Sequence, residues 1–283
     1  MPDADTAGPA SAIVWFRHEF HRRLCFLGPL LPWLYRFLFQ KAEQAYLRFQ
    51  TFEGPIFTLG LRECNLRAEY AEESLAKIPR HGPVVIVANH PHCGLEGLLL
   101  GDLLCRRVRG DFRFLATSAA AVLPRVSNYI IPLVMDPGPE RSRQNAAALR
   151  KAVEWLRGGG LLVVFPAGAV AQPSIPSFAI AEQPWQPVAA RLARLTRAYV
   201  LPVYFHGVRH WTFYAARLLH RDLPYLALAW KEWRAKPRSI RISIGDLVPP
   251  GLDTRSDVEW TKFLRSRTLA LGTTDGAREP RPR

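Results

Sequence analysis

The sequence predicts a single α/β domain in which helices flank a largely parallel β-sheet, preceded by an N-terminal helical hairpin. Candidate strands alternate with candidate helices from residue 84 to residue 205, which is the order that a parallel sheet requires. The runs at 84–88 and 161–165 are apolar throughout, as in strands that are covered on both faces. With 283 residues, 48% of them hydrophobic, the chain is long enough to bury one substantial core.

Composition divides the chain into four segments. Residues 1–10 and 272–283 are expected to be disordered tails, residues 11–52 to form the helical hairpin, and residues 53–271 to form the α/β domain. The first residues are small and acidic, unlike the basic start of a signal peptide. The apolar run at 24–35 has only twelve residues and contains two prolines, so it is too short to span a membrane.

The N-terminal hairpin has the chemistry of a membrane contact. Its first helix repeats apolar residues at spacings of three and four between basic ones, from Ile13 through Phe16 and Phe20. Gly28-Pro29 separates it from a second aromatic segment at 31–49. Apolar faces with basic flanks are typical of helices that lie in the interface of a bilayer. The alternative is that these faces pack on the domain.

The elements of the domain are expected in a regular order. They are short strands at 56–59 and 65–70, a strand at 84–88, a helix at 97–105, a strand at 112–116, a helix at 140–157, a strand at 161–165, a helix at 184–197, a strand at 199–205, one or two helices at 211–233, a strand at 238–244 and a helix at 257–271. Three glycines end the helix at 140–157. The strand at 238–244 alternates polar residues with isoleucine, as an edge strand does.

The charge of the chain indicates anionic partners. The formal net charge is +14 and the isoelectric point is near 10.2, which suits nucleic acid or an anionic membrane surface. No recognition helix, zinc motif or aromatic RNA-binding signature is present, so we expect a membrane lipid surface and no nucleic acid. The four cysteines lack paired spacing, which indicates a reducing compartment.

Three predicted strands end in polar or Gly/Pro-rich turns, at 89–93, 166–168 and 206–210. Because ligands of open α/β sheets bind at the carboxyl ends of the strands, we expect these turns to converge. In the first turn, His90 is suited to take a proton from a hydroxyl near neutral pH, with Glu96 accepting from its other ring nitrogen. Other interpretations are a helix cap formed by Asn89 and His90, a metal site, or a Cys93 nucleophile.

The motifs resemble those of the glycerol-phosphate/lysophospholipid acyltransferase superfamily, in particular its haemolysin-like branch. Asn89-His90-Pro91 followed by Gly94-Leu95-Glu96-Gly97 is similar to the first motif, and Phe165-Pro166-Ala167-Gly168 to the third. Leu201-Pro202-Val203 with Gly207 is similar to the fourth. The order and spacing of these motifs agree over roughly residues 60–250.

The resemblance implies transfer of a fatty acyl group from a thioester to the hydroxyl of a lysolipid or glycerol-phosphate-type acceptor. The thioester donor is acyl carrier protein or coenzyme A, with no bound cofactor and no metal. His90 takes the position of the base and Glu96 that of its carboxylate. Substrate contacts are expected from Asn89, His92, Gly94, Arg125, Phe165, Pro166, Gly168, His206 and Arg209. The expected location is the cytoplasmic face of the membrane, as a peripheral or monotopic protein.

The sequence departs from the family pattern at two places. Glu96 stands where the usual residue is Asp, and the third motif continues as Ala169-Val170-Ala171-Gln172 without the usual polar residues. The second departure removes expected phosphate ligands and favours a non-phosphate acceptor such as a lyso-ornithine lipid. The alternative functions are a non-enzymatic basic protein that binds anionic lipid, and a thioesterase-like lipid hydrolase. No Gly-x-Ser-x-Gly elbow is present.

Overall fold

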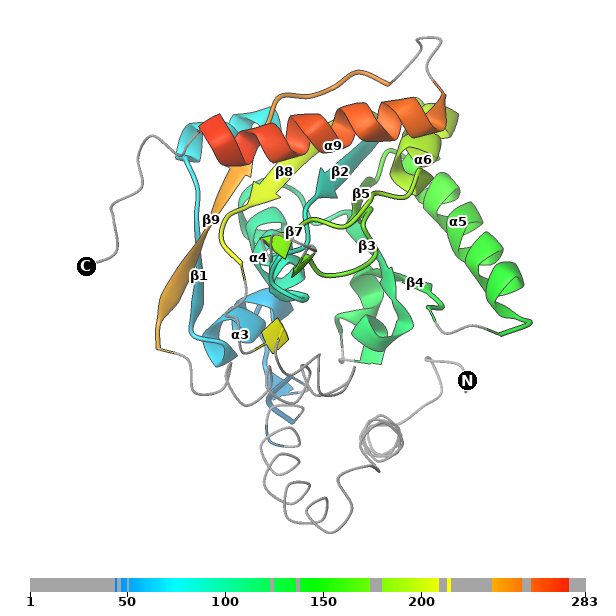
Figure 1. The fold of residues 1–283 in the computed structure, drawn as a ribbon. Coiled ribbons are helices and arrows are strands. Elements are labelled where there is room, and N and C mark those ends of the chain that lie inside the picture. The colour runs from blue at the N-terminus through cyan, green and yellow to red at the C-terminus, as the bar shows by residue number, and fades with distance from the viewer. Residues whose placement is uncertain are drawn as a thin grey trace.

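Figure 1 shows the computed structural model of the chain, which describes residues 44, 47–49, 51–122, 125–135, 138–173, 180–208, 213–214, 236–250 and 256–274. The predictions for the tails at 1–10 and 275–283, for most of the hairpin at 11–52, and for most of the helical region at 211–233 lie outside these residues. In the part of the chain that the structure describes, no helix is both long and apolar enough to cross a membrane.

Seven strands form one sheet in the order β1-β9-β8-β2-β5-β3-β4. The strands are β1 (Leu66–Glu69), β2 (Val84–Ala88), β3 (Phe112–Thr117), β4 (Ile130–Leu133), β5 (Leu161–Val164), β8 (Tyr199–Phe205) and β9 (Arg238–Ile244). All neighbours are parallel except β8 and β9, which confirms the predicted largely parallel sheet. A separate antiparallel hairpin joins β6 (Gln172–Pro173) to β7 (Ile180–Ala181).

Helices cover both faces of the sheet (Figure 1). Because alternate residues of a strand point to opposite faces, Val84 and Ile86 pack on one side and Val85 and Val87 on the other. The first side holds α3 (Ile56–Glu63) and α4 (Leu95–Leu103), the second α5 (Arg141–Arg157), α6 (Val188–Thr196) and α9 (Asp257–Thr274). The described elements also include the 3₁₀ turns η2 (Glu72–Lys77), η4 (Ser118–Val122) and η5 (Ser127–Tyr129) and the π-helical turn η3 (Leu104–Val108).

The prediction of a strand at 56–59 was wrong, because this segment begins helix α3. The apolar residues continue to Leu61, and the helix packs closely on α4. A Cβ on Gly60 would lie 2.7 Å from Leu98. The predicted edge position of β9 was also wrong, since β9 lies between β1 and β8. Its isoleucines face the core while the alternate polar face is less covered, which produces the same alternation.

Three helices differ at their boundaries from the predictions. Helix α4 spans Leu95–Leu103 where 97–105 was predicted, and a π-helical turn at Leu104–Val108 follows it. Helix α6 begins at Val188 and not at 184, because Pro184 and Pro187 keep the chain out of the helix until then. Helix α9 continues to Thr274, three residues beyond the predicted end of the domain at 271.

The side chain of buried Arg109 forms hydrogen bonds to the amino ends of three neighbouring strands. Its guanidinium donates to the carbonyl oxygens of Gly82 at 2.9 Å and Gly159 at 2.7 Å, and to the carboxylate of Asp111 at 2.7 Å. These residues lie just before β2, β5 and β3, respectively. Because the strand starts are held together here, the carboxyl ends of the same strands emerge in fixed register at the opposite edge.

Replacing buried Arg109 by Ala leaves two partly buried carbonyl groups without a donor, so we expect the free energy of unfolding to fall by about 2 kcal/mol or more. Arg107→Ala is the matched control, because that guanidinium is 43% exposed in its ion pair with Glu72. The control should cost less than about 1 kcal/mol. Urea unfolding of both variants checks this, and equal losses would contradict the role given to Arg109.

Candidate active site

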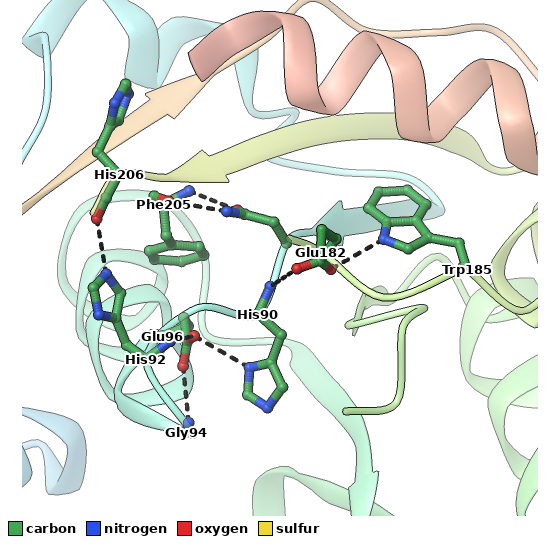
Figure 2. A network of polar contacts seen from close by, with 9 residues as sticks. His90, His92, Gly94, Glu96, Glu182, Trp185, Phe205 and His206 are labelled. Carbon is green, nitrogen blue, oxygen red and sulfur yellow. Dashed lines mark hydrogen bonds and ion pairs between the residues drawn. The ribbon is translucent and has the colours of Figure 1, made fainter. Parts of the chain in front are cut away.

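The three polar turns predicted from the sequence meet at one edge of the sheet. Strand β2 pairs in parallel with β5 on one side and β8 on the other, so their carboxyl ends emerge together. The ring of His90, after β2, lies 4.9 Å from the ring of Phe165, after β5. The ring Nε2 of His92 lies 2.8 Å from the carbonyl oxygen of His206, after β8. Figure 2 shows the turn of His90 and His92 beside Phe205 and His206.

A tight turn carries the chain from β2 into α4. Cys93 and Gly94 both adopt left-handed backbone angles, with φ values of 56° and 96°. Glycine adopts this conformation readily, whereas it is uncommon for a residue with a Cβ. The turn brings Glu96, in the first turn of α4, back against the residues that precede the helix. Strained backbone at this position is a feature that often accompanies functional sites.

Glu96 is a charged residue with no exposed surface, and the turn itself supplies its partners. Its carboxylate accepts the backbone N–H of His92 and that of Gly94, the latter at 2.8 Å. Burial raises the pKa of this carboxyl, but the imidazoles of His90 and His92 and the hydrogen bonds outweigh burial and hold the pKa at about 2. Glu96 is therefore ionised at neutral pH.

The ionised Glu96 determines how His90 is protonated. Nδ1 of His90 lies 3.2 Å from Oε1 of Glu96, a contact with the geometry of an ion pair and not of a well-aligned hydrogen bond. Contacts of this length often tighten when substrate binds. Because a carboxylate only accepts protons, Nδ1 carries the hydrogen and Nε2 of the neutral ring holds the lone pair. The His90 side chain is 19% exposed, so the ring that carries Nε2 is partly accessible.

Asn89 and His92 hold the turn to strand β8. The Asn89 amide donates to the carbonyl of Phe205 at 2.9 Å and accepts the N–H of Phe205 at 2.8 Å. His92 Nε2 donates to the carbonyl of His206, since a carbonyl oxygen only accepts. Both residues are buried, so their polar atoms extend the pairing of β2 and β8 beyond the strands. Their predicted contact with substrate stays a prediction.

Other predicted site residues are placed differently. The ring of His206 points away from His90 (Figure 2), with Nε2 2.8 Å from Ser243 Oγ and Nδ1 3.1 Å from the Arg241 guanidinium. Arg125 donates to the carbonyls of Phe52 and Gly54, the latter at 3.0 Å. Within the described ranges, the guanidinium of Arg125 is thus directed to the segment before α3 and not to the His90 turn. Arg209 lies outside the described residues.

The third motif supplies a turn and backbone contacts at the site. Gly168 has a φ of 61°, and its N–H donates to the carbonyl of Phe165 at 3.0 Å, which closes the turn after β5. The carbonyl of Pro166 accepts the N–H of Gln186 at 2.9 Å. These contacts direct the following segment, which contains Ala171, back toward His90.

Sequence reasoning missed Glu182, a carboxyl residue beside His90. Its Oε2 accepts the backbone N–H of His90 at 3.1 Å, and its Oε1 accepts the indole N–H of Trp185 at 3.1 Å (Figure 2). The available signal was that Glu182 is the first charged residue after the uncharged stretch at 158–181. Burial raises the pKa of this carboxyl.

The histidines of the turn do not converge on a common point. His92 directs Nε2 to the carbonyl of His206, whereas His90 directs Nδ1 to Glu96 (Figure 2). Among the residues that the structure describes, no group of three or more His, Cys, Asp or Glu side chains is arranged to hold a metal ion.

Glu96 should contribute a pH-dependent part of the stability. Because its folded-state pKa of about 2 lies below the ordinary value of 4.5, the unfolded chain binds more protons between these pH values. The contribution, of the order of 3 kcal/mol, is present above the ordinary pKa and is lost as the pH falls toward 2.

We therefore expect the difference in unfolding free energy between the wild-type chain and Glu96→Gln to shrink as the pH falls from 4.5 to 2. Denaturant titrations across this pH range measure it. Glu154→Gln, at an exposed position of α5, serves as the control that leaves the wild-type pH dependence in place. A difference that does not vary with pH would contradict the assignment.

Comparisons with known proteins find similarity to acyltransferases. The lyso-glycine lipid O-acyltransferase of Phocaeicola vulgatus is 22% identical over 215 residues, covering 73% of this chain and 74% of that protein. The enzyme of the same name from Bacteroides thetaiotaomicron is 22% identical over 212 residues, covering 72% and 71%. The crystal structure of the 1-acyl-sn-glycerophosphate (LPA) acyltransferase PlsC from Thermotoga maritima matches with a TM-score of 0.49 and 17% identity, covering 92% of this chain and 98% of that one.

The family comparison covers most of the chain. The model of the Acyltransferase family matches residues 22–231, which include all three polar turns. The resemblance to the glycerolipid acyltransferase superfamily is thus confirmed, while the assignment to its haemolysin-like branch stays a prediction. The chain belongs to the Acyltransferase family.

Proposed function

We propose that the protein transfers a fatty acyl group from an acyl thioester to the hydroxyl of a lysolipid, with His90 as general base and Glu96 as the residue that orients it. The observation that carries the proposal is the buried, ionised Glu96 beside Nδ1 of His90. With the proton on Nδ1, Nε2 of the neutral ring carries the lone pair that would accept a proton. The membership of the Acyltransferase family supports the reaction class.

The proton balance of the reaction requires only His90. Nε2 takes the proton of the acceptor hydroxyl as its oxygen attacks the thioester carbonyl carbon. When the tetrahedral intermediate collapses, the carbon–sulfur bond breaks, and the imidazolium returns its proton to the departing thiolate. The products are an ester and a free thiol, and His90 is neutral again. Throughout, the negative charge of Glu96 stabilises the transient imidazolium and holds the ring orientation.

We further infer that the acceptor is an amino-acid lysolipid, such as a lyso-glycine or lyso-ornithine lipid. Both relatives are named as lyso-glycine lipid O-acyltransferases. The segment at 169–172 carries no charged side chain that could bind a phosphate. The guanidinium of Arg125 donates hydrogen bonds to the carbonyls of Phe52 and Gly54. A phosphate acceptor would favour a cationic side chain directed into the site.

The proposed place of action is the surface of a membrane, at its cytoplasmic face. A lysolipid and its diacyl product reside in the bilayer, so the enzyme must approach it. The formal charge of +14 favours an anionic surface, where each nearby basic residue adds about 1 kcal/mol. The aromatic and basic segment at 11–52 is the proposed contact, and acyl carrier protein or coenzyme A would deliver the donor from the aqueous side.

His90→Ala should lower the rate of acyl transfer by about 10²- to 10⁴-fold, because it removes the general base. The assay supplies palmitoyl-acyl carrier protein or palmitoyl-coenzyme A with lyso-glycine lipid, lyso-ornithine lipid or lysophosphatidic acid, and mass spectrometry quantifies the ester product. His81→Ala is the matched control, since His81 is exposed and precedes β2 at the opposite end of the strand.

Three outcomes would count against parts of this proposal. Undiminished transfer by His90→Ala would exclude His90 as the base. Preference of the wild-type enzyme for lysophosphatidic acid over both amino-acid lysolipids would exclude the proposed acceptor. Release of free fatty acid without ester formation would instead identify a hydrolase.

A further inference from the structure

The backbone of His90 is held from both sides by one hairpin. The N–H of Ala171 donates to the carbonyl of His90 at 3.0 Å. On the other side, Oε2 of Glu182 accepts the N–H of His90 at 3.1 Å. Residue 171 immediately precedes β6 and residue 182 immediately follows β7, and these strands pair through Gln172 and Ala181. The two arms of the hairpin therefore close on the residue that carries the proposed base.

Glu182 is in turn fixed by two neighbours from different elements. Its Oε1 accepts the indole N–H of buried Trp185 at 3.1 Å. Its backbone carbonyl accepts the guanidinium of Arg265, on α9, at 3.0 Å. Figure 2 shows the carboxyl group between the His90 backbone and the Trp185 ring. A side chain with this many directional contacts has one well-defined orientation.

We propose that Glu182 is a positioning residue for His90, which sets the orientation of the imidazole through its backbone and adds a second negative charge near it. This inference rests on the proposed function, because it assumes that His90 is the base. Glu182 itself touches neither of the reacting groups. A displacement of about 1 Å at a reacting centre is enough to cost about 10²-fold in rate, so backbone positioning has a measurable effect.

The site requires a carboxylate at this position for a geometric reason. Two N–H groups, one from the His90 backbone and one from Trp185, point at the two oxygens of Glu182. A carboxylate accepts at both oxygens, whereas the amide of glutamine presents an NH₂ group to one of them. Glu182→Gln therefore conserves the shape of the side chain but places its NH₂ group opposite the N–H of His90 or of Trp185. Aspartate retains both acceptors on a side chain that is one methylene shorter.

The charge of Glu182 acts together with the groups that surround it. Those groups are His90 after β2, Glu96 on α4, Tyr204 on β8 and Arg265 on α9. A negative charge near His90 favours the protonated ring, as Glu96 does. Removing it should make His90 easier to deprotonate, so the acidic limb of the pH profile of kcat/KM should move to lower pH.

The test compares wild-type enzyme with Glu182→Gln, Glu182→Asp and Trp185→Phe in the acyl-transfer assay. We expect Glu182→Gln to lower kcat by about 10- to 100-fold without changing KM for donor or acceptor, and to shift the acidic limb to lower pH. Glu182→Asp should recover part of kcat, and the acidic limb of its pH profile should lie at the wild-type pH. Trp185→Phe, which removes the N–H partner of the carboxylate together with part of a buried ring, should lose activity several-fold. Glu154→Gln is the matched control at an exposed glutamate.

Each result decides the inference. Wild-type kcat in Glu182→Gln, or equal losses in the Gln and Asp variants with an unshifted pH profile, would overturn it. If Glu182→Gln does not fold, wild-type kcat in both Glu182→Asp and Trp185→Phe would overturn it, and a reduced kcat in Trp185→Phe would support it. His90→Ala in the same assay separates the two proposals. An active His90→Ala defeats the proposed function, whereas an inactive one beside an unaffected Glu182→Gln defeats this inference alone.

Discussion

The buried carboxylate of Glu96 constrains the rest of the site. A charge with no exposed surface is stable only when its surroundings supply hydrogen bonds and opposite charge. Here the turn supplies two backbone N–H donors, and His90 supplies the nearby imidazole. Bringing those donors to Glu96 requires two consecutive residues in the left-handed region, which explains the strained Cys93 beside Gly94. The same carboxylate fixes the proton of His90 on Nδ1, so one interaction links the local fold to the chemistry.

The rest of the sheet keeps this turn in place. Arg109 ties the starts of β2, β3 and β5 at one edge, and Asn89 continues the pairing of β2 with β8 at the other. The hairpin of β6 and β7 then holds the backbone of His90 from the remaining side. The core and the site are therefore connected through hydrogen bonds that side chains and one hairpin N–H make to the backbone. Residues far apart in the sequence thus determine the orientation of a single imidazole.

Apolar runs and strand-end polarity were sufficient to predict most of the sheet, because buried parallel strands such as β2 and β5 are apolar on both faces. They were insufficient for α3, whose short apolar run at 56–59 fits a strand or a helix until its packing on α4 is known. His90 and Glu96 were predicted because they lie in one short turn of the sequence and have the required chemistry. Glu182 was missed because 92 positions separate it from His90, and only the hairpin brings them together. The sequence also could not show which part of His206 faces the site. Its backbone carbonyl contacts His92, whereas its ring contacts Ser243.

The protonation of His90 is the most direct test of the central claim, that Glu96 holds Nδ1–H and leaves Nε2 to act as the base. Long-range ¹H–¹⁵N spectra of protein labelled at histidine report the tautomer of each ring, and loss of a signal in His90→Ala assigns it. We expect neutral His90 to carry its proton on Nδ1, with Nε2 unprotonated. A neutral His90 protonated on Nε2 would contradict the claim, because that nitrogen would then have no lone pair with which to accept the proton of the lipid hydroxyl.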